Sequence, residues 1–122
     1  MPRSLRLYLS DILQAITRIH ALMEELDESQ FKAGVPQTDG ILFNLMTIGE
    51  AAKNIPQEFR EQTPDINWSD IGRFRDFGVH HYFSLNMARV WDIVHTDLPE
   101  LQQAVVSLLD AASEDDTDQP LR

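Results

Sequence analysis

The stretch of sequence that decides the fold covers residues 87–112 and reads MARVWDIVHTDLPELQQAVVSLLDAA. Its apolar residues alternate between spacings of four and three: Met87, Trp91, Val94, Leu98, Leu101, Val105, Leu108 and Ala112. This spacing places them along one face of an α-helix, which must then pack against other helices. Pro99 interrupts the stretch. Because Asp97 can cap a helix and proline is tolerated in a first turn, we predict two nearly collinear helices with a kink near 96–99.

Two stretches earlier in the chain repeat this spacing. In residues 4–27 it runs through Leu5, Leu9, Ile12, Ile16, Ile19, Met23 and Leu26. In residues 37–55 it runs through Ile41, Leu45, Ile48, Ala52 and Ile55. Each stretch therefore predicts a long amphipathic helix. Ser4 is the expected N-cap of the first helix, and Pro56 limits the second.

Shorter helices are predicted between these long ones. Residues 28–34 can form one turn that ends at Gly34, residues 57–62 another, and Asn67 can cap a helix that begins at Trp68. Alternation with period two is too brief anywhere in the chain to predict a strand. We therefore predict an all-α fold, an antiparallel up-and-down bundle of four to six helices.

Length and composition fit one globular domain. The chain has 122 residues, of which 43% are hydrophobic, enough for a single core. We predict one helical domain over residues 1–112, followed by an acidic, flexible tail over 113–122. The chain has no cysteine, which excludes disulfides and fits a reducing cytosol. The N-terminal residues resemble neither a signal peptide nor a membrane span, so we expect a cytoplasmic protein.

The charge distribution is uneven. The net charge of −10 argues against a general nucleic-acid coat, because phosphate binding usually leaves a basic footprint. Residues 72–95 hold three of the ten Lys and Arg residues against two acids, a local charge of +1 within a remainder of −11. A cationic cleft in an acidic body fits these values. A solubilising acidic surface explains the overall charge equally well.

Residues 72–82, which read GRFRDFGVHHY, concentrate the side chains that could do chemistry. The pattern is Arg75, four residues, His80, one residue and then Tyr82. It resembles the Arg-x4-6-His motif of the HEPN superfamily, in the Arg-x4-His-x-Tyr form of HepT-like toxins. Residues 45–64 and 91–101 resemble the segments that flank the motif in that family. One difference is Asp76, where the family often has Asn.

The resemblance implies a HEPN-like helical bundle and a metal-independent endoribonuclease without a cofactor. Arg75, His80 and Asp76 match the catalytic positions, and Arg73 and His81 are neighbours that could bind substrate. The family further implies a homodimer with the motifs at a shared cleft, an RNA substrate and a minimal nucleotidyltransferase antitoxin as partner. That partner would silence the toxin by transferring AMP to Tyr82.

The residue types suit RNA cleavage. Histidine exchanges protons near neutral pH, and arginine offers a permanently charged fork to phosphate. On a straight helix, however, Arg75 and His80 lie about 140° apart. Either the helix deforms near Gly78 or the two groups meet across a subunit boundary. Asp76 and His80 are four residues apart, so we expect a contact that orients the imidazole.

Two non-catalytic interpretations stay open. The motif could be a buried polar network that holds helices together, or the chain could be a non-catalytic helical binding module that engages a nucleotidyltransferase. Glu50 and Lys53 are interpreted as a solvated pair, while Gly49 and the pair Ala51–Ala52 would let another helix approach closely. The four histidines lack the spacing of a metal site, and no Gly-rich phosphate loop is present.

Overall fold

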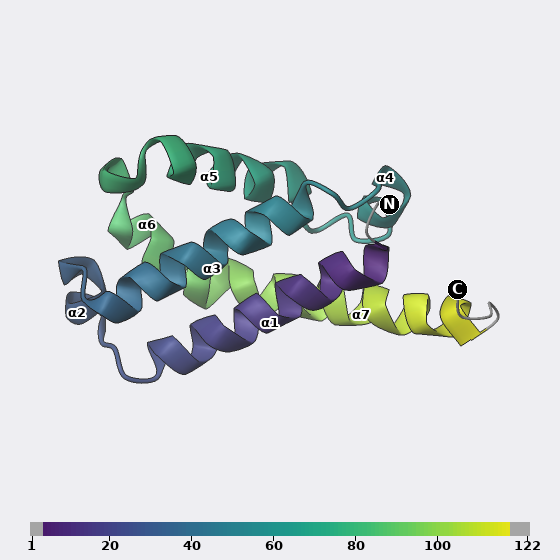
Figure 1. The fold of residues 1–122 in the computed structure, drawn as a ribbon, viewed down its shortest axis with the longest axis horizontal. Coiled ribbons are helices and arrows are strands. Elements are labelled where there is room, and N and C mark those ends of the chain that lie inside the picture. Colours follow the sequence, from purple (N-terminus) through teal and green to yellow (C-terminus); the bar gives the residue numbers. More distant parts are fainter. Residues whose placement is uncertain (1–3, 118–122) are drawn as a thin grey trace.

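The computed structural model describes residues 4–117, and all the regular structure in this range is helical. The elements are α1 (Leu5–Met23), α2 (Glu28–Ala33), α3 (Pro36–Ala52), α4 (Gln57–Arg60), α5 (Trp68–His80), the 3-10 turn η1 (Tyr82–Ser84), α6 (Met87–Asp92), the π-helical turn η2 (Ile93–Asp97) and α7 (Leu98–Thr117). Successive long helices run in opposite directions (Figure 1). The predicted all-α, up-and-down bundle is confirmed. Among the described helices, none is long and apolar enough to cross a membrane.

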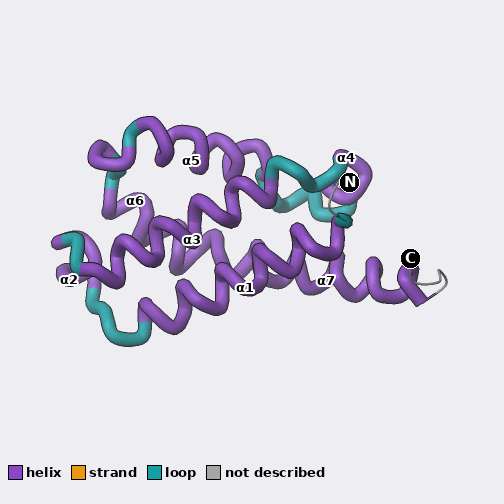
Figure 2. The backbone as a smooth tube through the Cα atoms, viewed as in Figure 1, coloured by secondary structure: helices purple, strands orange, loops and turns teal. Residues whose placement is uncertain are grey.

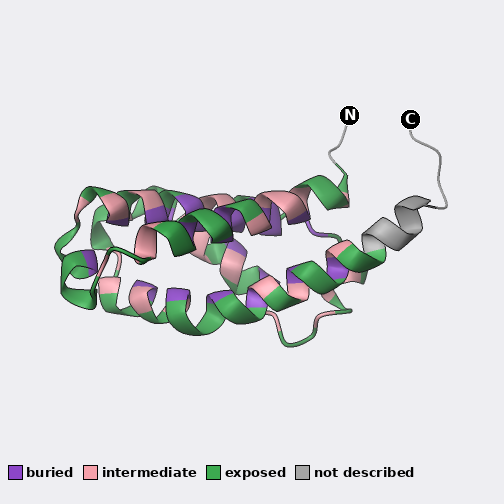
Figure 3. Ribbon diagram, turned by 90° about the horizontal axis from the view of Figure 1, so that it is seen from below, coloured by how far each residue is buried: buried purple, intermediate pink, exposed green. Residues whose placement is uncertain are grey.

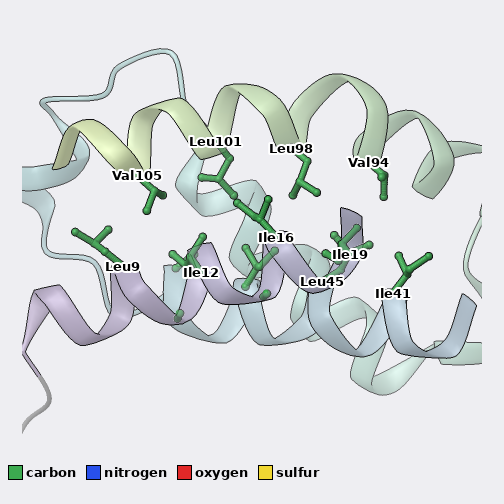
Figure 4. Packing of buried hydrophobic residues seen from close by; sticks show 14 of the residues in the cluster. Leu9, Ile12, Ile16, Ile19, Ile41, Leu45, Val94, Leu98, Leu101 and Val105 are labelled. Atoms are coloured by element: carbon green, nitrogen blue, oxygen red, sulfur yellow. The ribbon is translucent and has the colours of Figure 1, made fainter. Parts of the chain in front are cut away.

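The core lies where α1, α3 and α7 meet. Figure 4 shows Val94, Leu98, Leu101 and Val105 directed toward the α1 side chains Leu9, Ile12 and Ile16. The buried residues follow the predicted four-three spacing, and outward-facing positions are exposed (Figure 3). Helix α5 packs on α3 at the opposite side of α3 from this core. The sequence pattern therefore determined which faces are buried.

Helix ends follow local chemistry. The Ser4 hydroxyl accepts a hydrogen bond from the Leu7 N–H at 3.3 Å, and the Asn67 side chain accepts one from the Asp70 N–H at 3.0 Å. Both predicted N-caps are confirmed. Gly34 ends α2 with a φ of +82°, a left-handed conformation that glycine adopts without strain. Figure 2 shows the connecting loops, of which the one after α4 leads into α5.

Two helices are present here as predicted, α6 and α7, but the π-helical turn η2 joins them and the predicted cap at Asp97 is wrong. The helical path from α6 continues through η2 into α7, and the Leu98 N–H donates to the carbonyl of Ile93, five residues earlier. Asp97 therefore lies within the helical path and does not cap a new helix. Proline has no N–H, and in an α-helix its ring collides with the carbonyl four residues before it. The wider π-helical turn accommodates Pro99 without a break.

Helix α7 continues to Thr117, so the first five residues of the predicted tail, 113–117, are helical. The rest of that tail, residues 118–122, lies outside the described residues. The division into a domain over 1–112 and a flexible tail stays a prediction.

The contact between α3 and α5 is unusually close at Gly49. A Cβ atom on Gly49 would overlap the Cβ of Arg75 and lie 2.9 Å from the carbonyl oxygen of Ile71. Farther along, a Cβ on Gly78 would lie 2.7 Å from the terminal methyl of Met46. The close approach predicted at Gly49 is confirmed. This contact holds the backbone of α5, the motif helix that carries Arg75 and His80, directly against α3.

We expect Gly49→Ala to destabilise the fold by about 1–3 kcal/mol, because the added methyl meets α5 backbone that cannot move independently. Gly40→Ala in the same helix is the matched control, since its methyl meets only the end of the Leu22 side chain. There the higher helix propensity of alanine should leave stability equal or raised. Urea denaturation measures both variants. Equal stability of the two would contradict a rigid contact at Gly49.

Candidate functional site

Arg75 is held in place by α3. Its Nε donates to Oε2 of Glu50 at 2.9 Å, and its NH1 donates to Oδ1 of Asp76 at 3.1 Å. Its side chain is 32% exposed, so the guanidinium is still open to a ligand. The close contact at Gly49 fixes the backbone of Arg75, while Glu50 fixes its charged end. Helix α3 therefore determines where this cation sits.

Asp76 continues this arrangement. Its Oδ1 accepts a hydrogen bond from Nζ of Lys53 at 2.9 Å. Glu50, Arg75, Asp76 and Lys53 thus form a row of alternating charges across α3 and α5, which we call the ion chain. The hydrogen bond from Lys53, followed by that from Arg75, lowers the pKa of Asp76 below its usual value, because both cations favour the ionised carboxylate.

His80 is not bonded to the ion chain. Helix α5 is regular from Trp68 to His80, so it does not deform near Gly78 to bring His80 round to Arg75. The expected bond with Asp76 is absent, since that carboxylate binds Lys53 and Arg75. His80 is exposed, and among the described residues its imidazole has neither a hydrogen bond nor an ion pair. Its imidazole is therefore free to act on a ligand or on a second chain.

The two neighbouring residues predicted to bind substrate point to other partners. His81 is exposed at the end of α5, and its ring packs on that of Phe77 with centroids 4.7 Å apart. Arg73 forms an ion pair with Asp70. It lines a groove of about 640 Å³ between α5 and the α6–α7 segment, with Leu45 and Ile48 among its apolar lining residues. Arg73 and Arg75 therefore do not share one binding surface.

Tyr82 lies in η1, directly after the motif helix, and contacts the beginning of α3. Its hydroxyl donates to Oδ1 of Asp39 at 2.9 Å. Partial burial, followed by the hydrogen bond to the Asp39 carboxylate, raises the pKa of Tyr82 above its usual value. The next residue, Phe83, is 99% exposed and packs edge-on against the Tyr82 ring. The phenol is thus anchored, while its neighbour is open to solvent.

Sequence reasoning missed three residues of this site. Glu50 and Lys53, interpreted as a solvated pair, each bind a residue of α5, and Asp39 was not considered. A signal for the first two was available, since they stand beside Gly49, the residue predicted to allow close helix approach. Asp39 gave no comparable signal, because its hydrogen bond with Tyr82 forms only when the end of α5 lies beside the beginning of α3.

The interpretation as a buried polar network does not fit the exposure of the ion chain. The side chains of Lys53, Asp76 and Glu50 are 40%, 49% and 53% exposed. Solvent-exposed ion pairs contribute at most about 1 kcal/mol each, so these pairs position charges more than they hold the helices together. No cluster of three or more His, Cys, Asp or Glu side chains suited to a metal ion occurs among the described residues.

Comparison with known proteins identifies the family. The family model described as ribonuclease HepT-like matches residues 12–108. A protein of Thermococcus cleftensis named "Probable ribonuclease HepT" is 35% identical over 102 residues, which are 84% of this chain and 93% of that protein. A "Putative RNase" of Methanocaldococcus jannaschii is 30% identical over 118 residues, 95% of this chain and 98% of that protein.

A longer protein of Methanocaldococcus jannaschii, named "Gamma-glutamylcyclotransferase and putative RNase", is 29% identical over 110 residues. These residues cover 90% of this chain but only 50% of that relative. No solved structure matches this chain. The family model covers most of the chain, and a relative above 30% identity is matched over nearly its whole length. This chain therefore belongs to the HepT-like ribonuclease family.

Proposed function

We propose that this protein is a HepT-like toxin of the cytoplasm, a metal-independent endoribonuclease that cuts RNA. The observation that carries the proposal is the fixed position of Arg75. Helix α3 holds this arginine on the motif helix, partly exposed, in a family whose curated relatives are named as RNases. A guanidinium in a fixed position recognises phosphate in two-point geometry and loses little freedom on binding.

In the proposed reaction, His80 takes the proton from a ribose 2′-hydroxyl, and that oxygen attacks the adjacent phosphorus. Arg75 stabilises the extra negative charge on the phosphoryl oxygens. The bond to the 5′-oxygen breaks, and that oxygen leaves with a proton donated by a second imidazole. The products are a 2′,3′-cyclic phosphate and a 5′-hydroxyl. Asp76 supports Arg75 in this scheme, because it binds Arg75 and not His80.

A homodimer would bring Arg75 of one chain close to His80 of the other. In one chain, regular α5 geometry keeps Arg75 and His80 on different faces, so a twofold cleft is the arrangement that brings two arginines and two histidines together. Exposed apolar side chains at the end of α5 and in η1 support such an interface. Val79 is 50% exposed and Phe83 is 99% exposed. A cleft formed in this way would place two guanidinium groups and two imidazoles around one bound phosphate.

A nucleotidyltransferase partner is the proposed antitoxin, with Tyr82 as the acceptor of AMP. The attached nucleotide adds a bulky phosphodiester anion beside the motif, where it competes with RNA phosphate for Arg75. The anchored position of the Tyr82 hydroxyl supports this role, since the acceptor is presented in one orientation.

The alternative is a non-catalytic helical module that only engages the nucleotidyltransferase. One observation favours it: in the single chain, Arg75 is paired with two carboxylates and is not bonded to His80. Incubation of the purified dimer with RNA separates the two functions, because only the toxin would generate cyclic phosphate ends.

We expect Arg75→Ala and His80→Ala each to reduce RNA cleavage by at least about 10²-fold, since each removes a group that acts in the transition state. Both side chains are partly or fully exposed, so melting temperature should change little. His81→Ala should be milder, and Arg18→Ala on α1 is the charge-matched control. Cleavage of labelled RNA in excess chelator measures all four. An essential His81 beside a dispensable His80 would contradict the assignment.

The protein should scatter light as a dimer, at twice the 14.0 kDa of one chain. Phe83→Asp should dissociate it and abolish cleavage, because a charge in the interface would be desolvated without a partner. Val106→Asp, on the exposed side of α7, is the matched control and should remain dimeric. A monomer at micromolar concentration that still cleaves RNA would contradict the shared cleft.

Tyr82→Phe should fold normally, retain cleavage activity and escape silencing by the partner, because it lacks only the acceptor hydroxyl. Incubation of the wild-type protein with the partner, ATP and magnesium should add about 329 Da per AMP, measured by intact mass. Tyr8 is the internal control, since it is the only other tyrosine of the chain. Modification that persists in Tyr82→Phe would assign the acceptor elsewhere.

A further inference from the structure

We propose that Asp39 is the residue that accepts the phenolic proton of Tyr82 when AMP is transferred to it. The inference rests on the proposed function of Tyr82 as AMP acceptor, and it assigns to this chain a chemical part in its own modification. In this reading the acceptor site is built from two elements, with the nucleophile on η1 and the base on α3.

The geometry places the two groups together. Asp39 lies in the first turn of α3, and Tyr82 follows α5, 43 residues later in the chain. Because α5 runs antiparallel along α3, its end returns to the beginning of α3, and the hydroxyl meets Oδ1 of Asp39 at 2.9 Å. Among the described residues, this is the only hydrogen-bond partner of the Tyr82 hydroxyl.

No other charged group competes for this proton in the described structure. Helix α5, which packs against η1, contributes His80 and His81, and neither bonds to the hydroxyl. Lys53 and Arg75, the cations of the ion chain, are occupied by the carboxylates of Asp76 and Glu50. Asp39 also lies in the first turn of a helix, where the macrodipole stabilises a negative charge.

The chemistry needs such an acceptor. A neutral phenol is a weak nucleophile, and burial together with Asp39 raises the pKa of Tyr82, so phenolate is scarce at neutral pH. The proton must therefore leave as the new bond forms. A carboxylate that accepts the proton of the attacking hydroxyl is the arrangement that protein kinases use in phosphoryl transfer.

The step balances without a further reagent. The Tyr82 oxygen attacks the α-phosphorus of ATP, the bond between that phosphorus and the bridging oxygen to the β-phosphate breaks, and pyrophosphate leaves. The phenolic proton passes to Asp39 and then to solvent. The product is the tyrosyl phosphodiester of AMP, and Asp39 has lost the hydrogen bond that anchored Tyr82.

The test measures AMP transfer to the full chain by the proposed nucleotidyltransferase partner, with ATP and magnesium. Asp39→Asn keeps the size and an acceptor oxygen but cannot take a proton. It should lower kcat for transfer on the order of 10²-fold and leave the KM for the chain unchanged. Asp39→Glu should recover part of the rate. Asp92→Asn, on the exposed surface of α6, is the matched loss of one carboxylate and should react as the wild type.

A second measurement needs no partner. Titration of phenolate absorbance, with Tyr82→Phe subtracted to remove Tyr8, reports the pKa of Tyr82. Asp39→Asn should lower this pKa toward the ordinary tyrosine value, because a carboxylate that disfavours phenolate has been removed. Circular dichroism establishes that the variants are folded. If Asp39→Asn unfolds, the comparison of Asp39→Glu with wild type decides the question in its place, because the longer side chain displaces the carboxylate and should slow transfer.

Each outcome is decisive. Wild-type kcat in Asp39→Asn would overturn the proposal while leaving Tyr82 as the acceptor, and would assign the base to the partner. A raised KM with unchanged kcat would make Asp39 a docking residue and would equally overturn it. Absence of AMP on the wild-type chain, or its presence on Tyr82→Phe, would instead remove the proposed modification itself, and the proposal with it.

Discussion

The site depends on the contact between Gly49 and the backbone of α5. Any side chain at this position would overlap the Cβ of Arg75, so the two helices can approach this closely only because Gly49 lacks a Cβ atom. The short interhelical distance allows Glu50 and Lys53 to reach across to α5 and bind Arg75 and Asp76. Replacing one Cα hydrogen of Gly49 with a methyl group would push α3 and α5 apart and separate these ion pairs. The position of the candidate phosphate-binding cation is therefore a property of helix packing.

One side of α3 organises the candidate site. Asp39 and Glu50 are eleven residues apart, close to three helical turns, so they lie on nearly the same side of α3. Asp39 binds Tyr82 and Glu50 binds Arg75. The motif segment supplies the groups proposed to meet RNA and AMP, and α3 supplies the carboxylates that hold them. Chemistry and positioning are thus divided between two antiparallel helices.

Sequence reasoning predicted the part of this structure that depends on local periodicity. The four-three spacing identified the buried faces, and the residues Ser4, Gly34 and Asn67 identified helix ends, because capping depends on neighbours within one turn. The π-helical turn before Pro99 was not predicted, since such a turn has no distinct sequence signal.

The interactions between elements were harder to predict. Asp76 was expected to contact His80, its neighbour at four residues, but Lys53 of α3 and adjacent Arg75 bind its carboxylate. A periodic pattern shows which side of a helix is polar, and it does not show which polar group from another helix will arrive there. The bond between Asp39 and Tyr82, which depends on the antiparallel path of α3 and α5, was out of reach for the same reason.

The ion chain has a further consequence for how an anion would enter. It contains two cations and two carboxylates, so its formal charge is zero although it includes Arg75. A bare arginine that binds a phosphate displaces condensed counterions from the nucleic acid, which makes affinity fall steeply with salt. Here an incoming phosphate would also compete with Glu50 and Asp76 for the guanidinium. Dissolved salt weakens those internal pairs as well as the pair with phosphate. The two effects of salt therefore partly cancel. The affinity for RNA would depend less on ionic strength than the two cations of the ion chain alone would imply.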